Sequence, residues 1–208
     1  MTLTIVSTIL ILISLWTSYK DWKVDNSVIK KAYFQNLIDW PIALIIVFGV
    51  MLSFLILYSI DIPQFLTWSL FSLFGSESSG NVMFTPFTLG FLPITIIFYL
   101  VIASAVPYLA KSEEVIFRQY VFGVKYRIIK SIIFGFIHML VGVPILAAII
   151  LSIVGYIYSH YYIKEFSKWI KIDPDTALSK ALDRSTSIHA KYNFIVITFI
   201  FIVVLISN

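Results

Sequence analysis

The stretch that decides the fold is residues 131–163, SIIFGFIHMLVGVPILAAIILSIVGYIYSHYYI, which contains no Lys, Arg, Asp or Glu. One helix of this length would be about 50 Å long, whereas the hydrocarbon core of a bilayer is about 30 Å thick. Gly142-Val143-Pro144 is the natural place for a break, because glycine and proline interrupt helices. We therefore predict a short membrane span over about 132–140 and a longer one over about 144–163.

The composition of the whole chain is that of a membrane protein. Of its 208 residues, 60% are hydrophobic and only 12% are charged, and the mean hydropathy is +0.95. Soluble domains are typically about 45–50% apolar and about 25% charged. The chain has no cysteine, which excludes disulfides, thiolate metal sites and cysteine nucleophiles. The net charge of +4 is spread over short loops without interleaved aromatic residues, so we expect no nucleic-acid partner.

Outward from the central stretch, hydropathy predicts four further spans, or about six in all. The N-terminal run lacks the basic residues and cleavage site of a signal peptide, so we interpret it as a retained span. Residues 61–87 form an interfacial or re-entrant segment, and Asp173 or Asp175 caps a helix within the polar stretch 164–187. Pro93 and Pro107 are expected kinks in the third span. The four further spans cover about 3–19, 40–60, 88–110 and 188–206.

The basic residues predict the orientation of the chain. With six spans, all fifteen Lys and Arg residues lie on, or close to, the side shared by the first, third and fifth connections. Basic loops stay in the cytoplasm, which places both termini outside a bacterial plasma membrane. We predict an all-α, polytopic transmembrane helix bundle that forms one membrane domain over 1–208. In it, 1–87 contribute two spans and the interfacial segment, and 88–206 form a catalytic core.

A few ionisable residues lie in or beside the apolar spans, where they are costly and mark functional sites. Three pairs are spaced i, i+4 and so share a helix face. Two carboxylates, two imidazoles and one amide meeting at the cytoplasmic half of the bundle suffice to activate water and to stabilise an oxyanion. The residues concerned are Glu113, Glu114 and Arg118, then Phe134 and His138, then His189 and Asn193.

These residues form the motifs Glu113-Glu114-x-x-x-Arg118, Phe134-x-x-x-His138 and His189-x-x-x-Asn193. Together they resemble the signature of the CAAX-protease and bacteriocin-processing (Abi) family, which includes the Ras-converting CAAX endopeptidases. The resemblance covers about residues 88–206. It implies a glutamate-type intramembrane protease that needs no metal and no other cofactor.

The resemblance also implies a role for each motif residue. Glu113 would be the base that polarises water, assisted by His138. Glu114 would pair with Arg118, while Phe134 would pack. His189 and Asn193 would donate hydrogen bonds to the developing oxyanion. The implied substrate is a membrane-associated or lipidated peptide, and its identity and the oligomeric state stay open.

Several alternatives stand beside the protease hypothesis. One alternative is a non-catalytic bacteriocin self-immunity or scaffold protein. Another is a small transporter. Glu113, His138 and His189 would make a three-ligand zinc site in a metalloprotease. In a purely structural interpretation, the glutamates and Arg118 form an interfacial ion-pair cluster, and the histidines occupy core or interfacial positions. His160, beside Tyr158, Tyr161 and Tyr162, is expected to be interfacial.

Overall fold

The structure is a computed structural model that describes residues 2–60, 62–69 and 92–206, which are helical over most of their length and contain no strand. This confirms the predicted all-α class for that part of the chain. Three short helices are not α-helical: a π-helix at Lys31–Gln35 and 3-10 helices at Gln64–Thr67 and His138–Val141. The α-helices are α1 (Thr2–Val24), α2 (Ser27–Lys30), α3 (Asp39–Tyr58), α4 (Leu92–Arg118), α5 (Val124–Ile137), α6 (Ile145–Trp169) and α7 (Pro174–Ile206).

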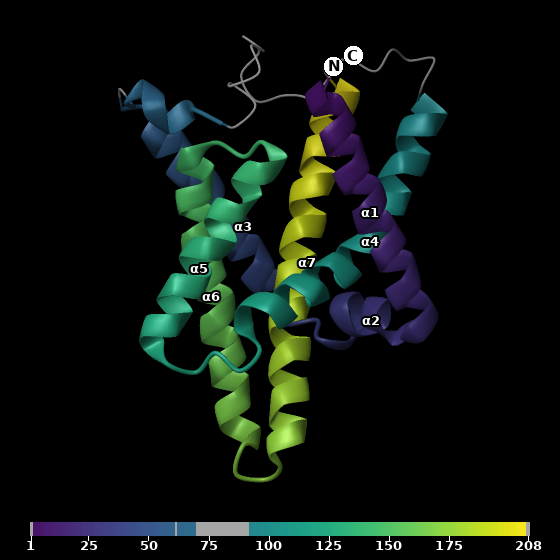
Figure 1. Cartoon of the computed structure of the whole chain (residues 1–208), viewed down its shortest axis with the longest axis vertical. Helices are drawn as coiled ribbons and strands as arrows, with labels where there is room; N and C mark the ends of the chain where they lie inside the picture. Colours follow the sequence, from purple (N-terminus) through teal and green to yellow (C-terminus); the bar gives the residue numbers. More distant parts are fainter. Residues whose placement is uncertain (1, 61, 70–91, 207–208) are drawn as a thin grey trace.

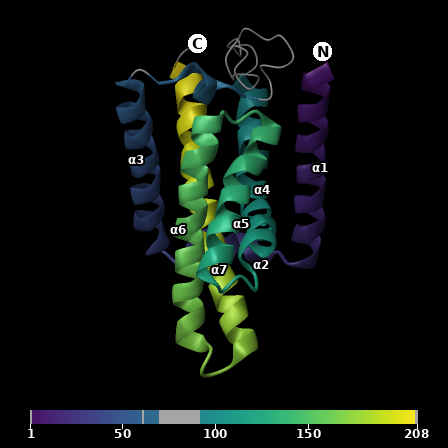
Figure 2. The same ribbon diagram turned by 60° about the vertical axis from the view of Figure 1, so that its left-hand side comes forward.

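The helices form an elongated bundle around α7. Helices α1, α3, α5, α6 and α7 and the first part of α4 run along the long axis in alternating directions (Figures 1 and 2). Both termini therefore lie at the same end of the molecule (Figure 1). Helix α7 contacts α3, α4 and α6, while α5 packs on α6 and α1 packs on α4. Residues far apart in the sequence thus meet along α7.

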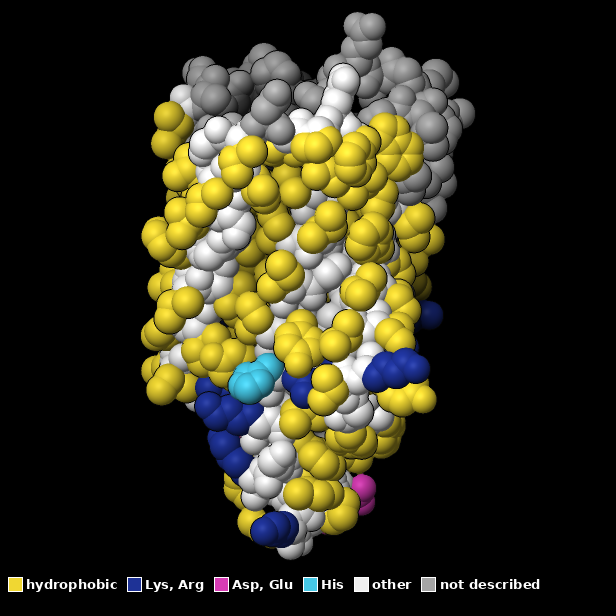
Figure 3. Space-filling model, turned by 90° about the vertical axis from the view of Figure 1, so that its left-hand side faces the viewer, with side chains coloured by type: hydrophobic (Ala, Val, Ile, Leu, Met, Phe, Trp, Pro, Cys, Tyr) yellow, Lys and Arg dark blue, Asp and Glu magenta, His cyan; other side chains and the backbone are white. Residues whose placement is uncertain are grey.

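Four helices are long and apolar enough to cross a membrane: Asp39–Leu57, Ile96–Phe117, Ile145–Trp169 and Pro174–Val203. They correspond to four of the predicted spans and support the membrane class. Figure 3 shows a broad apolar band on one face of the bundle, with the Lys and Arg side chains gathered toward its lower end.

The other parts of the six-span prediction are not established. The run 3–19 lies in α1, but many of its side chains fall outside the described residues. Helix α5 has only 14 residues, which is about 21 Å at 1.5 Å per residue. Most of the predicted interfacial segment 61–87 also lies outside the described residues, apart from the 3-10 turn near Trp68.

The predicted break in the central apolar stretch is confirmed. The chain reverses between α5 and α6, where Gly142 has a φ of 91°. Only glycine adopts this left-handed conformation without steric cost. Pro144 then stands in an extended conformation directly before the first residue of α6, a position where its missing N–H costs nothing.

Helix α5 starts earlier than predicted. It begins at Val124, not near 132, so the basic residues assigned to a connection belong to the helix. Arg127 shows why the helix tolerates them. Its Nε donates to the Ser159 hydroxyl at 3.0 Å, and its guanidinium lies 5.0 Å from the centre of the Tyr156 ring. The long aliphatic stem is buried while the charge finds partners on α6.

The polar stretch 164–187 is also mostly helical, and it contains the predicted helix start. Helix α6 continues to Trp169 and α7 begins at Pro174, so the two form a hairpin that extends beyond the other helices (Figure 1). Asp173, one of the two predicted caps, accepts a hydrogen bond from the Thr176 backbone N–H at 2.8 Å. Hydrogen bonds from the side chain and backbone of Thr176 lower the pKa of the Asp173 carboxyl. Hydropathy alone missed both helix ends because their residues are polar.

Helix α4 likewise runs past its predicted end at 110 and continues to Arg118. Pro107 lies inside it, and the helix changes direction partway along, so that its second part crosses the bundle (Figure 1). Proline removes one helical hydrogen bond and forces such a bend. The side chain of Pro93, the other predicted kink, is outside the described residues. The bend carries the glutamate motif toward α7.

Candidate active site

The first and third motifs meet where α4 crosses α7. The His189 Nδ1 lies 2.9 Å from the Glu114 Oε1, and the Arg118 Nε lies 3.5 Å from the Glu114 Oε2. All three side chains are at most 2% exposed. An ionised carboxylate only accepts hydrogen bonds, so the imidazole donates through Nδ1. A buried carboxylate is tolerated here because it has both a cationic and a hydrogen-bonding partner.

Arg118 is anchored to two further helices. Its Nη2 donates to the Gly155 backbone carbonyl on α6 at 3.2 Å. Its guanidinium lies 4.2 Å from the centre of the Phe134 ring on α5. A Cβ atom on Gly155 would lie 2.7 Å from the Phe134 ring and 3.0 Å from the Arg118 Nη2. A glycine at 155 is therefore what lets α6 approach both side chains.

Glu113 differs from Glu114 in how exposed its side chain is. Its side chain is 33% exposed, yet its Oε2 is buried and, within the described residues, has no hydrogen-bond partner. This oxygen lies 3.6 Å from the His189 Nε2. The contact is attractive only when a proton lies between the two atoms. His189 thus stands between two carboxylates, one buried and paired with Arg118 and one partly exposed.

His138 is half-buried and has a defined tautomer. Its Nδ1 is 2.7 Å from the Phe134 carbonyl oxygen, which can only accept, so in the neutral ring Nε2 is left as a base. The His138 ring lies 4.9 Å from the Phe134 ring, which in turn lies 5.5 Å from the His189 ring. Phe134 packs between motifs, as predicted. The imidazole found beside Glu113 is His189, not the predicted partner His138.

Asn193 is less integrated than predicted. It lies one turn beyond His189 on α7 and is half-buried, but in the described structure its amide makes no hydrogen bond to the other site residues. The structure therefore brings together Glu113, Glu114, Arg118, Phe134 and His189, with His138 joined through Phe134. Asn193 lies on the same part of α7 as His189 but does not contact the other site residues through its amide.

Tyr158 belongs to the site, although the sequence singled it out only as a neighbour of the interfacial His160. Its ring is fully buried and stacks on the His189 imidazole at 4.6 Å with an angle of 25° between the planes. His160 is exposed and packs on Tyr161, in keeping with its predicted interfacial position. A usable signal was present, because Gly155, Tyr158 and Tyr162 recur every three to four residues and so mark one face of α6.

A second buried polar cluster lies on another face of α7 and was not predicted. Lys191, fully buried, donates to the Asn36 carbonyl at 2.7 Å and to the Ser187 hydroxyl at 2.8 Å. Asp39 on α3 has ion-pair contacts of 2.8 Å with Arg184 and 4.0 Å with Lys191, although neither meets hydrogen-bond geometry. Lys191 is rotated by about 200° from His189 on the helix. We call Asp39, Arg184, Ser187 and Lys191 the Asp39–Lys191 clamp.

The residues at the site do not fit a three-ligand metal centre. Among the described residues, no group of three or more His, Asp and Glu side chains is placed to hold a metal ion. Comparison with known proteins found no matching family model, no matching curated protein and no matching solved structure. The functional assignment therefore depends on the chemistry of these side chains and on the motif pattern.

Proposed function

We propose that the chain is a metal-independent intramembrane endopeptidase that cleaves a membrane-associated or lipidated peptide with a water activated by Glu113. The observation that carries the proposal is the position of Glu113, which is one-third exposed while its Oε2 lies 3.6 Å from the His189 Nε2. A general base must reach water and must have a partner that manages the proton. Glu113 meets both conditions, and the three motifs support the same chemistry by their family resemblance.

In the proposed reaction, a Glu113 carboxylate oxygen takes a proton from water as the water oxygen attacks the peptide carbonyl carbon. The carbonyl oxygen becomes an oxyanion. The Asn193 amide donates a hydrogen bond to it, and so does the His189 Nε2–H once Glu113 has taken up the proton from water and no longer attracts that hydrogen. The C–N bond then breaks, the proton passes to the leaving nitrogen, and a carboxylic acid and an amine result.

Glu114 and Arg118 serve this reaction without touching the substrate. Both are buried, and Glu114 holds the His189 Nδ1 at 2.9 Å. This hydrogen bond fixes which imidazole nitrogen faces Glu113. Because a fixed tautomer and ring orientation preorganise the site, the pair contributes to rate as well as to packing.

The proposal includes a placement in the membrane. We propose six spans in a bacterial plasma membrane, with the site toward the cytoplasm and both termini outside. The support is the distribution of basic residues, since the connections α1–α2, α4–α5 and α6–α7 lie at the end opposite the termini (Figures 1 and 2). Cytoplasmic loops are enriched in Lys and Arg.

The test compares cells that express the wild-type chain with cells that express Glu113→Gln, at equal amounts of folded protein. We expect new peptide termini, detected by mass spectrometry of the membrane fraction, only with the wild type. Glu165→Gln is the matched control, because Glu165 lies in the α6–α7 hairpin and pairs with Lys168. It should cleave like the wild type.

Two outcomes contradict the proposal. Identical new termini with Glu113→Gln would remove the base from the mechanism. Absence of cleavage by the wild type, with full protection of cells against a bacteriocin by both proteins, would favour the non-catalytic immunity alternative. Chelation should leave cleavage unchanged; stoichiometric zinc that is lost together with activity would favour the metalloprotease alternative.

A further inference from the structure

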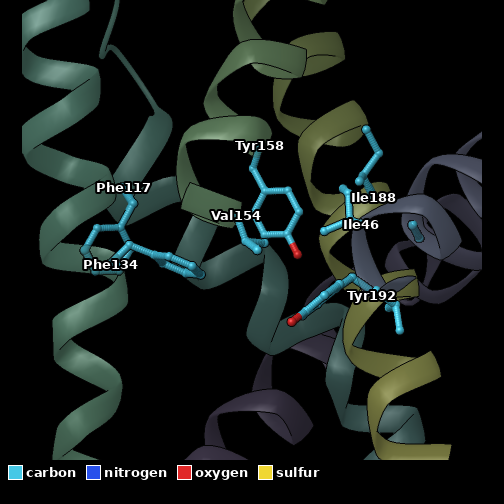
Figure 4. Close-up of a cluster of buried hydrophobic side chains, with 9 residues drawn as sticks. Ile46, Phe117, Phe134, Val154, Tyr158, Ile188 and Tyr192 are labelled. Atoms are coloured by element: carbon cyan, nitrogen blue, oxygen red, sulfur yellow. The ribbon is translucent and has the colours of Figure 1, made fainter. Parts of the chain in front are cut away.

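The His189 imidazole is held by two aromatic rings as well as by the carboxylates. Tyr158 on α6 stacks on its face at 4.6 Å and 25°, and Phe134 on α5 meets it edge-on at 5.5 Å and 81°. Both rings are at most 1% exposed. Figure 4 shows Tyr158 reaching from α6 toward α7, and Phe134 reaching from α5 toward α6. The imidazole plane is thus enclosed on its face and at its edge.

This enclosure matters because a histidine side chain has a soft terminal torsion, so one hydrogen bond does not fix the plane of the ring. A tilt about the Nδ1–Glu114 bond would swing Nε2 away from the Glu113 Oε2, which is already at 3.6 Å. Stacked and edge-on aromatic pairs attract each other beyond the effect of the area that they bury. The stack therefore opposes the tilt.

We infer that Tyr158 is a positioning residue that keeps the His189 Nε2 directed at Glu113. For its effect on cleavage, the inference rests on the proposed function. Its effect on the imidazole does not, because ring orientation is measurable without a substrate.

The aromatic ring, and not the hydroxyl, performs this role. The hydroxyl of Tyr158 is buried and, among the described residues, has no hydrogen-bond partner. Figure 4 shows it directed toward Tyr192, along α7. A buried hydroxyl without a partner is unfavourable, so its removal should not lower stability. Phenylalanine should therefore replace Tyr158 fully, whereas a non-aromatic side chain of similar size should not.

The first measurement is nuclear magnetic resonance of histidine ring protons in the detergent-solubilised protein. The chain has only three histidines, so His138→Gln and His160→Gln variants assign the signals. A stacked ring shields the protons beneath it, and Tyr158→Leu or Tyr158→Met should shift the His189 signals downfield. Tyr158→Phe should leave them in place. Tyr162→Leu is the matched control, one turn further along α6, where the ring packs on Phe166.

The second measurement is turnover at equal folded concentration. Tyr158→Leu and Tyr158→Met should lower kcat by about 10- to 100-fold, because a displacement of about 1 Å at a reacting group costs this much. Tyr158→Phe should stay within about twofold of wild type. Unmoved His189 signals in Tyr158→Met would overturn the inference, as would a Tyr158→Phe protein that is inactive with unmoved signals. A wild-type chain without cleavage activity would defeat the proposed function, while the spectra would still decide the positioning role.

Discussion

The two polar faces of α7 bury similar charged groups for different purposes. On one face, Lys191 and Arg184 converge on Asp39, and the Lys191 ammonium donates two hydrogen bonds. On the other face, His189 faces Glu114, which Arg118 neutralises, and Glu113, which is partly open to solvent. Buried charge that serves only stability is closed off by partners. The site face differs because one carboxylate, that of Glu113, stays partly exposed.

The clamp also explains how α7 is held in register. The Ser187 hydroxyl donates to the Ala32 carbonyl at 3.1 Å, and Lys191 donates to the Asn36 carbonyl. Both carbonyls lie in or beside the π-helix, where regular hydrogen bonding is interrupted. Satisfying them with α7 side chains fixes the rotation of α7 and, with it, the direction of His189.

The largest expected effect is a loss of activity that is confined to the site face of α7. Glu113→Gln should lower turnover by about 10²- to 10⁴-fold, the range for loss of a general base. The thermal midpoint should stay close to the wild-type value, because the side chain is one-third exposed and its Oε2 has no hydrogen bond to lose. Differential scanning fluorimetry beside the cleavage assay measures both. A large fall in the thermal midpoint of Glu113→Gln would mean that Glu113 also stabilises the fold.

The next effect is on stability. Asp39→Ala leaves Arg184 and Lys191 without their carboxylate, and removing one partner of a buried ion pair costs about 3–5 kcal/mol. We expect a large loss of monodisperse protein in detergent. Asp183→Ala is the matched control, because its pair with Lys31 is about one-third exposed and such pairs contribute about 0–1 kcal/mol. If both variants lose the same amount of monodisperse protein, the Asp39–Lys191 clamp does not stabilise the fold.

A smaller effect tests the packing between α6 and the site. Gly155→Ala would push a methyl group against Phe134 and Arg118, and overpacking of this kind costs about 1–3 kcal/mol. Because Arg118 positions Glu114, cleavage should fall more than the amount of folded protein does. The two readouts are measured on the same preparation. A loss of stability without a loss of specific activity would show that Arg118 can shift without consequence.

The smallest effect belongs to the start of α7, far from both faces. Asp173→Asn should lower the thermal midpoint slightly, because the carboxylate cap on Thr176 is weakened. The pKa of Asp173 is lowered in the folded chain, so its stabilisation is present above pH about 4 and is lost as the pH falls through the lowered pKa. The difference between variant and wild type should vanish in acid.

The contacts on the two faces of α7 differ in how far they could be predicted from the sequence. The Glu114–Arg118 pair was predictable because the two residues are one turn apart on one helix, which fixes their geometry. The contacts of His189 with Glu113 and Tyr158 depend on how three helices pack, and one sequence does not determine this. Asp39 was missed because it ends a polar stretch, where hydropathy does not reveal burial. Lys191 lies inside the predicted span 188–206, but its partners Asn36 and Asp39 come from a distant part of the chain that one sequence does not place beside α7.

The shortness of α5 has a consequence for the surrounding lipid. Its outward side chains, including Ile129, Ile133 and Phe136, are more than 40% exposed, yet the helix spans about 21 Å where an average bilayer core is about 30 Å thick. In the six-span arrangement proposed above, acyl chains beside α5 would have to compress to match, at an elastic cost of fractions of a kcal/mol per Å. Short-chain phospholipids would relieve this mismatch. The thickness of the host membrane would therefore influence α5, which carries Phe134 and leads directly into His138.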